Sequence, residues 1–85
     1  MTEPSFNFYV QVATAGDNLR GDAIRDARED TSLPRIGLDD EDRLFRHVRQ
    51  RVSDSGDSSH LEAAMEGLMA AWLSYVRWVQ RRRAA

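Results

Sequence analysis

The sequence predicts an all-helical domain, a compact bundle of four to five short crossed helices with a long C-terminal helix. Three observations favour this fold class. Apolar residues recur at three- and four-residue steps in the last third of the chain, which is the period of an amphipathic helix. Short segments rich in Gly, Ser and Asp separate the expected helices. Only one stretch alternates like a strand, and no second strand is available to pair with it.

The first element, residues 6–13, is the ambiguous one. Apolar residues alternate with Asn7, Tyr9 and Gln11 between Phe6 and Val12, and this period of two favours a strand. A lone strand would leave its backbone N–H and C=O groups unpaired. Periodicity alone leaves both states open, and the absence of a partner strand leads us to expect a helix.

The second element is a short helix over residues 22–28, with a thin apolar face of Ala23, Ile24 and Ala27. Pro34 lies beyond it and cannot continue it. The adjacent Gly21 is expected to permit close approach of another helix, and Asp22 is expected to pair with Arg25.

The third element opens with four acids, residues 39–42, where the helix dipole favours negative charge. Asp39 with Arg43, and Asp42 with Arg46, are spaced to form ion pairs one helical turn apart. The predicted buried stripe consists of Leu44, Phe45, Val48 and Val52.

The last element is a long helix from Ser58 or Ser59 to Arg83, interrupted only by Gly67. Ser59 and Glu62 have the spacing of a capping box at its start. Three arginines fall at its end, where cations meet the dipole favourably. Its apolar stripe consists of Leu61, Met65, Leu68, Trp72, Tyr75 or Val76, and Val79.

The order of several short motifs resembles that of the YozE-like small bacterial proteins, whose fold is similar to the sterile-alpha-motif (SAM) domain. The matching segments are Phe8-Tyr9, Gly21-Asp22, Ile24-Arg25-Asp26, Leu33-Pro34 and Ala71-Trp72 with Tyr75. Leu33 stands where that pattern has an aromatic residue, and the chain continues past Tyr75. The resemblance implies a SAM-like bundle. It implies little about function, although SAM-like folds are commonly interaction modules and some bind nucleic acid.

Length and composition indicate one domain over residues 1–85, with disordered ends at 1–4 and 84–85. The chain has no Cys, which excludes disulfides and Cys-based zinc sites. Its start lacks the pattern of a signal peptide, and its longest apolar run is too short to cross a bilayer. We therefore expect a cytoplasmic protein without membrane contact.

The sequence offers no catalytic constellation. It has two His, no Cys, no Lys and no Gly-rich phosphate loop. His47 and His60 have no converging partners in the sequence, so surface or capping roles are expected for both. We expect no enzyme activity, cofactor, metal or small-molecule substrate.

Two surfaces are candidates for binding. The first is the last helix, where Trp72, Tyr75, Trp78 and Val79 could contact another protein or a second copy of the chain, because aromatic residues often anchor interfaces. The alternative is that the whole stretch up to Val79 is core.

The second candidate is a set of arginines suited to phosphate or nucleic acid. All twelve basic residues of the chain are Arg, although its net charge is −2. The alternative is a solvated face neutralised by neighbouring acids. The candidate set consists of Arg43, Arg46, Arg49, Arg77, Arg81, Arg82 and Arg83.

Overall fold

The fold is built along one long helix, α4 (Leu61–Ala84). A computed structural model describes residues 3–56 and 58–84. Within them, α4 is preceded by α1 (Phe6–Val12), α2 (Leu19–Glu29), α3 (Glu41–Asp54) and a short 3₁₀ turn (Ser58–His60). The described residues contain helices and no strand, so the predicted all-helical class with a long C-terminal helix is confirmed.

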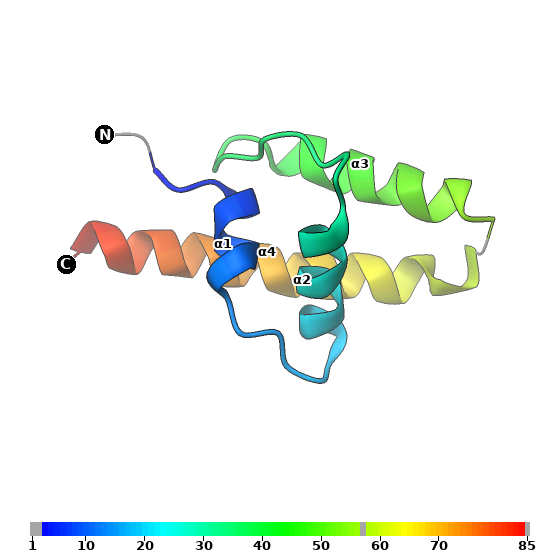
Figure 1. The fold of residues 1–85 in the computed structure, drawn as a ribbon, viewed down its shortest axis with the longest axis horizontal. Helices are drawn as coiled ribbons and strands as arrows, with labels where there is room; N and C mark the ends of the chain where they lie inside the picture. Colours follow the sequence, from blue (N-terminus) through cyan, green and yellow to red (C-terminus); the bar gives the residue numbers. More distant parts are fainter. Residues whose placement is uncertain (1–2, 57, 85) are drawn as a thin grey trace.

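Helix α4 runs along almost the whole length of the molecule, which measures 43 × 25 × 18 Å (Figure 1). Helix α3 lies beside its first half and runs in the opposite direction, whereas α1 and α2 cross over α4 (Figure 1). The second half of α4 therefore extends beyond α3, and of the other helices only α1 crosses it.

Helix α1 shows why the alternating pattern of its sequence does not produce a strand. Phe6, Tyr9 and Val10 are buried, and their spacing of three and four residues places them on one helical face. Phe8 and Val12, which a strand would place with Phe6, are exposed instead. The Ser5 side chain caps the helix by accepting a hydrogen bond from the Phe8 N–H.

The segment around Pro34 is tied to the start of α1 by backbone and side-chain hydrogen bonds. The Phe6 N–H donates to the Ile36 carbonyl at 2.7 Å. The Asn7 amide donates to the Pro34 carbonyl and accepts from the Ile36 N–H, at 3.1 and 2.9 Å. This pairing lets Ile36, which lies outside any helix, join the core.

Helix α2 approaches α4 closely at Gly67, where a Cβ atom would lie 2.3 Å from the Leu19 carbonyl oxygen. Gly21, expected to permit helix packing, instead packs against the loop before α2, because its Cβ would lie 1.7 Å from the Gly16 carbonyl oxygen. The side chain of Asn18 caps α2, which explains why the helix begins three residues before the predicted Asp22.

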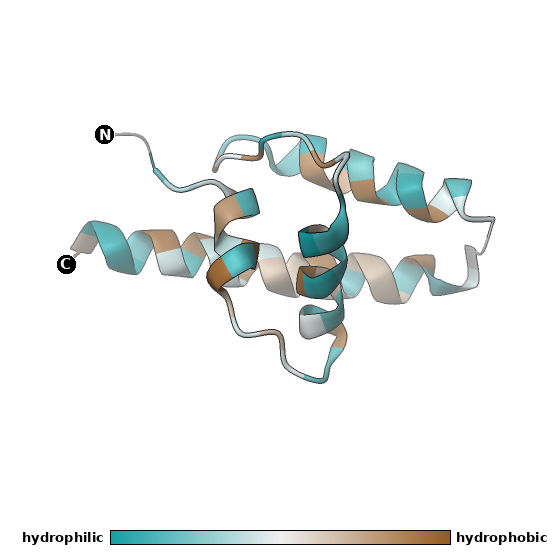
Figure 2. Ribbon diagram, in the orientation of Figure 1, coloured by the Kyte–Doolittle hydropathy of each residue, from teal (hydrophilic) through white to brown (hydrophobic). Residues whose placement is uncertain are grey.

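Helix α3 presents its hydrophobic residues toward α4 and its hydrophilic residues away from it (Figure 2). Glu41 and Asp42 occupy its first turn, as the dipole favours, but the Asp40 side chain accepts from the Gly37 N–H rather than capping the helix. Of the predicted pairs, neither Asp39–Arg43 nor Asp42–Arg46 is an ion pair in the described part of the chain.

The core lies where α1, α2 and α3 pack against α4. Five aromatic rings from α1 and α4 belong to this core or pack against it. The Phe6 ring meets the Tyr75 ring edge-on, with centroids 5.6 Å apart. The fully or nearly fully buried residues are Phe6, Tyr9, Val10, Ile24, Ile36, Leu44, Leu68, Ala71, Trp72, Tyr75 and Val79.

The sequence predicts disordered ends at residues 1–4 and 84–85. Residues 1, 2 and 85 lie outside the described residues. Glu3 forms an ion pair with Arg83, and the Pro4 carbonyl accepts a hydrogen bond from the Tyr75 hydroxyl at 2.7 Å. Ala84 is the last residue of α4. These contacts fasten the start of the chain to the last helix.

Candidate functional site

The four residues of α4 proposed from the sequence as a protein-binding surface are mostly internal. Trp72, Tyr75 and Val79 are at most 4% exposed, which agrees with the alternative that these residues belong to the core. Trp78 is half-buried, because its ring packs 5.2 Å from Tyr9 and 6.2 Å from Phe8, measured between ring centroids. These side chains hold α1 on α4 and leave little surface for a partner.

The opposite side of α4 carries the exposed apolar residues. Met69 and Leu73 are 41% and 45% exposed and lie one helical turn apart. Met65 and Val76 are half-buried beside them. We name this side the outward face of α4. It consists of Glu62, Glu66, Met69, Leu73, Arg77 and Gln80, all exposed.

The outward face is ordered by charge along the helix. Two acids precede the apolar pair, and Arg77 follows it. None of Glu62, Glu66 and Arg77 forms an ion pair with another described residue. The face therefore has an acidic end, an apolar centre and a basic end, and its charges are available to a partner. Sequence periodicity shows that Met69 and Leu73 widen the apolar stripe but does not show which side the core covers.

Three further apolar side chains are exposed on the two helices that cross α4. Phe8 and Val12 on α1 are 50% and 56% exposed, and Leu19 at the start of α2 is 40% exposed. They come from different elements than Met69 and Leu73, and no charged residue of α1 flanks them.

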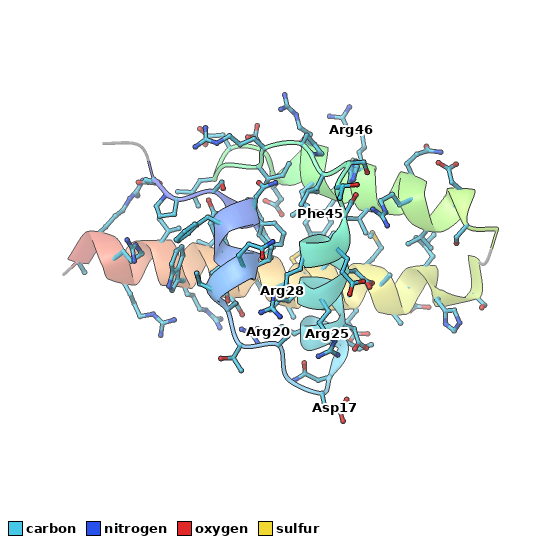
Figure 3. All side chains as sticks on the ribbon, viewed as in Figure 1. Asp17, Arg20, Arg25, Arg28, Phe45 and Arg46 are labelled. Carbon is cyan, nitrogen blue, oxygen red and sulfur yellow. The ribbon has the colours of Figure 1, made fainter. Side chains whose placement is uncertain are left out.

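The arginines proposed from the sequence do not form one patch. Arg43, Arg46 and Arg49 lie at three-residue steps on α3 and are exposed. Figure 3 places Arg46 on the edge of α3 away from α4. Arg77 lies roughly 180° around α4 from buried Leu68, at about 100° per residue. The α3 arginines and Arg77 therefore lie on different sides of the molecule.

The last three arginines of the set differ in their contacts. Arg82 stacks over the Trp78 ring, with its guanidinium carbon 4.9 Å from the ring centroid. Arg83 pairs with Glu3. Arg81 is exposed and forms no ion pair with a described residue. Two of these three side chains thus fasten the chain's own surface.

Three other arginines, all on α2, hold the loop between α1 and α2 (Figure 3). Arg25 donates to the carbonyls of Ala15 and Gly16, at 3.2 and 3.1 Å, and pairs with Asp22 as predicted. Arg28 donates to the carbonyls of Val10 and Ala13. Arg20 donates to Ser74, Tyr9 and Thr14. Part of the arginine bias therefore has a structural use, because a guanidinium can satisfy two carbonyls at once.

His47, for which the sequence offers no carboxylate partner, lies 2.7 Å from the Asp30 carboxylate. Arg51 pairs with the same carboxylate, and Ser32 donates to it through both its N–H and its hydroxyl. Burial raises the pKa of Asp30, but the hydrogen bonds of Ser32 and His47 and the charge of Arg51 outweigh it and lower that pKa to about 2.

Neither histidine belongs to a cluster that would suit a metal ion. Within residues 3–56 and 58–84, no group of three His, Cys, Asp or Glu side chains is placed to hold one. His60 is exposed in the 3₁₀ turn. In this same part of the chain, no helix combines the length and the apolar character that a bilayer-spanning segment requires.

No protein-family model matches the chain, and neither the curated proteins nor the solved structures contain a match to it. The resemblance to YozE-like proteins therefore stays a prediction.

Proposed function

We propose that this chain is a non-enzymatic interaction module that binds a second copy of itself through the outward face of α4. The observation that carries the proposal is the exposed pair Met69 and Leu73 between charges of opposite sign. Small domains gain stability by covering such apolar surface, and interfaces commonly have an apolar centre with a charged rim.

The order of charges favours an antiparallel pair of α4 helices. In a twofold dimer each residue i that contacts residue j is matched by j contacting i. If Met69 of one copy lies opposite Leu73 of the other, Glu66 comes within one residue, about 1.5 Å along the axis, of the position opposite Arg77. Glu62 then lies opposite Gln80. A parallel pairing would place like charges together.

Sedimentation velocity over a range of protein concentrations tests this proposal. The wild-type chain is expected to form dimers, and Leu73→Asp is expected to be monomeric because it places two carboxylates at the centre of the interface. Val12→Asp is the matched control, since Val12 is also an exposed apolar residue, 56% against 45% for Leu73, but lies on α1. A wild-type chain that is monomeric at all concentrations, or a Val12→Asp variant as monomeric as Leu73→Asp, would contradict the proposal.

The second candidate function is binding of phosphate or nucleic acid through Arg43, Arg46 and Arg49. Its support is that these exposed guanidinium groups form no ion pair with a described residue. It ranks second because the chain carries a net charge of −2. Replacing the three arginines by Ala should abolish binding to single- or double-stranded DNA, and wild-type binding should weaken steeply as salt rises. Absence of binding at low salt excludes this function.

We further propose a bacterial, cytoplasmic protein of the YozE-like family. The support is the order of short motifs described above.

A further inference from the structure

A cleft of about 450 Å³ lies between α2, α3 and the beginning of α4. Its volume falls in the range of small-molecule sites, which are mostly apolar with a few polar groups. It does not include Met69 or Leu73 and is therefore separate from the outward face of α4. Its apolar lining includes Ala23, Ala27, Val48, Val52, Ala63 and Ala64.

One wall of this cleft is acidic. Asp22 and Asp26 on α2 and Asp30 at its C-cap lie at four-residue steps and all line it. Asp22 is paired with Arg25, and Asp30 is held by Ser32, His47 and Arg51. Arg51, which pairs with Asp30, and His60 also line the cleft.

Asp26, in the middle of the wall, differs from its two neighbours. It forms no hydrogen bond or ion pair with any residue that the structure describes. Burial, together with the negative charges of Asp22 and Glu29, raises the pKa of its carboxyl group, and the positive charges of Arg51 and Arg25 offset only part of this rise. A positive charge placed beside Asp26 would relieve this repulsion, whereas a negative one would increase it.

We propose that the cleft binds a small organic cation, a protonated amine on an apolar body. The ammonium group lies at Asp26, and the apolar body lies against the alanine and valine side chains. Of the three aspartates that line the cleft, only Asp26 has no ion-pair partner among the described residues, so an anionic head group beside it would be repelled. A cationic head group gains a charge-assisted interaction with Asp26 that a purely apolar ligand cannot make. This site is independent of the proposed self-association.

Three probes with the same eight-carbon chain test the charge requirement: octylammonium, 1-octanol and octanoate. Titration of the ¹⁵N-labelled wild-type chain, followed by amide chemical shifts, should show octylammonium binding at least about tenfold more tightly than octanol. Octanoate should not bind. The largest shifts should fall on Ala23, Ala63 and Ala64. Equal affinity for octylammonium and octanol, or shifts centred outside the cleft, would overturn the proposal.

Two variants and a control locate the site. Asp26→Asn should lower the affinity for octylammonium about tenfold and leave that for octanol unchanged. Ala63→Leu should weaken both by filling the cleft. Asp17→Asn, an exposed acid in the loop before α2, should change neither (Figure 3). An Asp26→Asn variant that binds octylammonium as the wild type does would refute the assigned role of Asp26, and the head-group comparison tests the proposal without any substitution.

Discussion

Asp30 ends α2 and joins it to α3 through a side chain that is only 5% exposed. Its carboxylate accepts hydrogen bonds from Ser32 within the turn and is paired with His47 and Arg51 of α3. Because these partners bind the charged form, the folded state holds the Asp30 proton more weakly than the unfolded chain does. Asp30 thus links α2 to α3, and protonation of its carboxylate at low pH weakens this link.

The stability of the fold should depend on pH in the acid range because of Asp30. The pKa of Asp30 is about 2 in the folded chain against 3.8 as its ordinary value. Its contribution is therefore fully present above about pH 4 and is lost as the pH falls through 2. We expect a loss of about 1–2 kcal/mol across that range, measured by urea unfolding. Asp30→Asn should flatten this part of the profile, and an unchanged slope would contradict the assignment.

Gly67 is the residue that sets how closely α2 approaches α4. Alanine would improve the helix propensity of α4 by about 1 kcal/mol. Its Cβ would nevertheless lie 2.3 Å from a backbone oxygen of Leu19, and a backbone atom cannot rotate away. We expect Gly67→Ala to destabilise the fold by about 1–3 kcal/mol in chemical denaturation.

Gly37→Ala is the matched control for this substitution. The nearest atom to its added Cβ would be an Asp40 oxygen at 3.6 Å, an ordinary contact distance. Its free energy of unfolding should stay within about 0.5 kcal/mol of the wild-type value. If Gly67→Ala is equally neutral, the close approach of the two helices is not a constraint on this fold.

At the scale of elements, the arginines of α2 supply the hydrogen bonds that secondary structure would otherwise supply to the loop before this helix. Backbone carbonyls of the loop, which no helix satisfies, accept hydrogen bonds from Arg25 and Arg28 instead. Since Arg20 also reaches Ser74 on α4, the same helix connects the loop to the far side of the core.

This arrangement predicts that Arg28→Lys is not a conservative change. A lysine ammonium cannot match the fork geometry that reaches the carbonyls of Val10 and Ala13 together. The variant should lose about 1–2 kcal/mol of stability. Amide hydrogen exchange should become faster around residues 13–18. Arg49→Lys on the exposed face of α3 should leave both measurements unchanged, and equal effects of the two substitutions would contradict the proposed role of the α2 arginines.

For the whole molecule, the sequence predicts the helices better than it predicts their surroundings. The periodicity of α4 and the acids at the start of α3 are local signals, and helices form over both segments. Helix α4 itself begins at Leu61, after a 3₁₀ turn over Ser58–His60, and not at the predicted Ser58 or Ser59. The state of α1 depends on contacts with α4 and with Ile36, so its own alternating pattern is a misleading guide. Gly67 and Gly21 likewise require knowledge of which backbone lies opposite.

The candidate surfaces, too, are only partly predictable from local sequence. The sequence identifies α4 as wider in apolar residues than one stripe needs. It cannot show that α1 covers Trp78 and leaves Met69 and Leu73 exposed, because this depends on where the other helices cross. The cleft beside Asp26 is assembled from three helices and has no signal in any one of them.

The central claim is that α4 pairs with α4 of a second copy in antiparallel orientation, and charge reversal tests it most directly. Sedimentation equilibrium should show that Glu66→Arg and Arg77→Glu each weaken the dimer at least about tenfold, since twofold symmetry applies each change twice. The double variant should restore dimerisation to near the wild-type level. A double variant that dimerises no better than either single variant would contradict the proposed pairing.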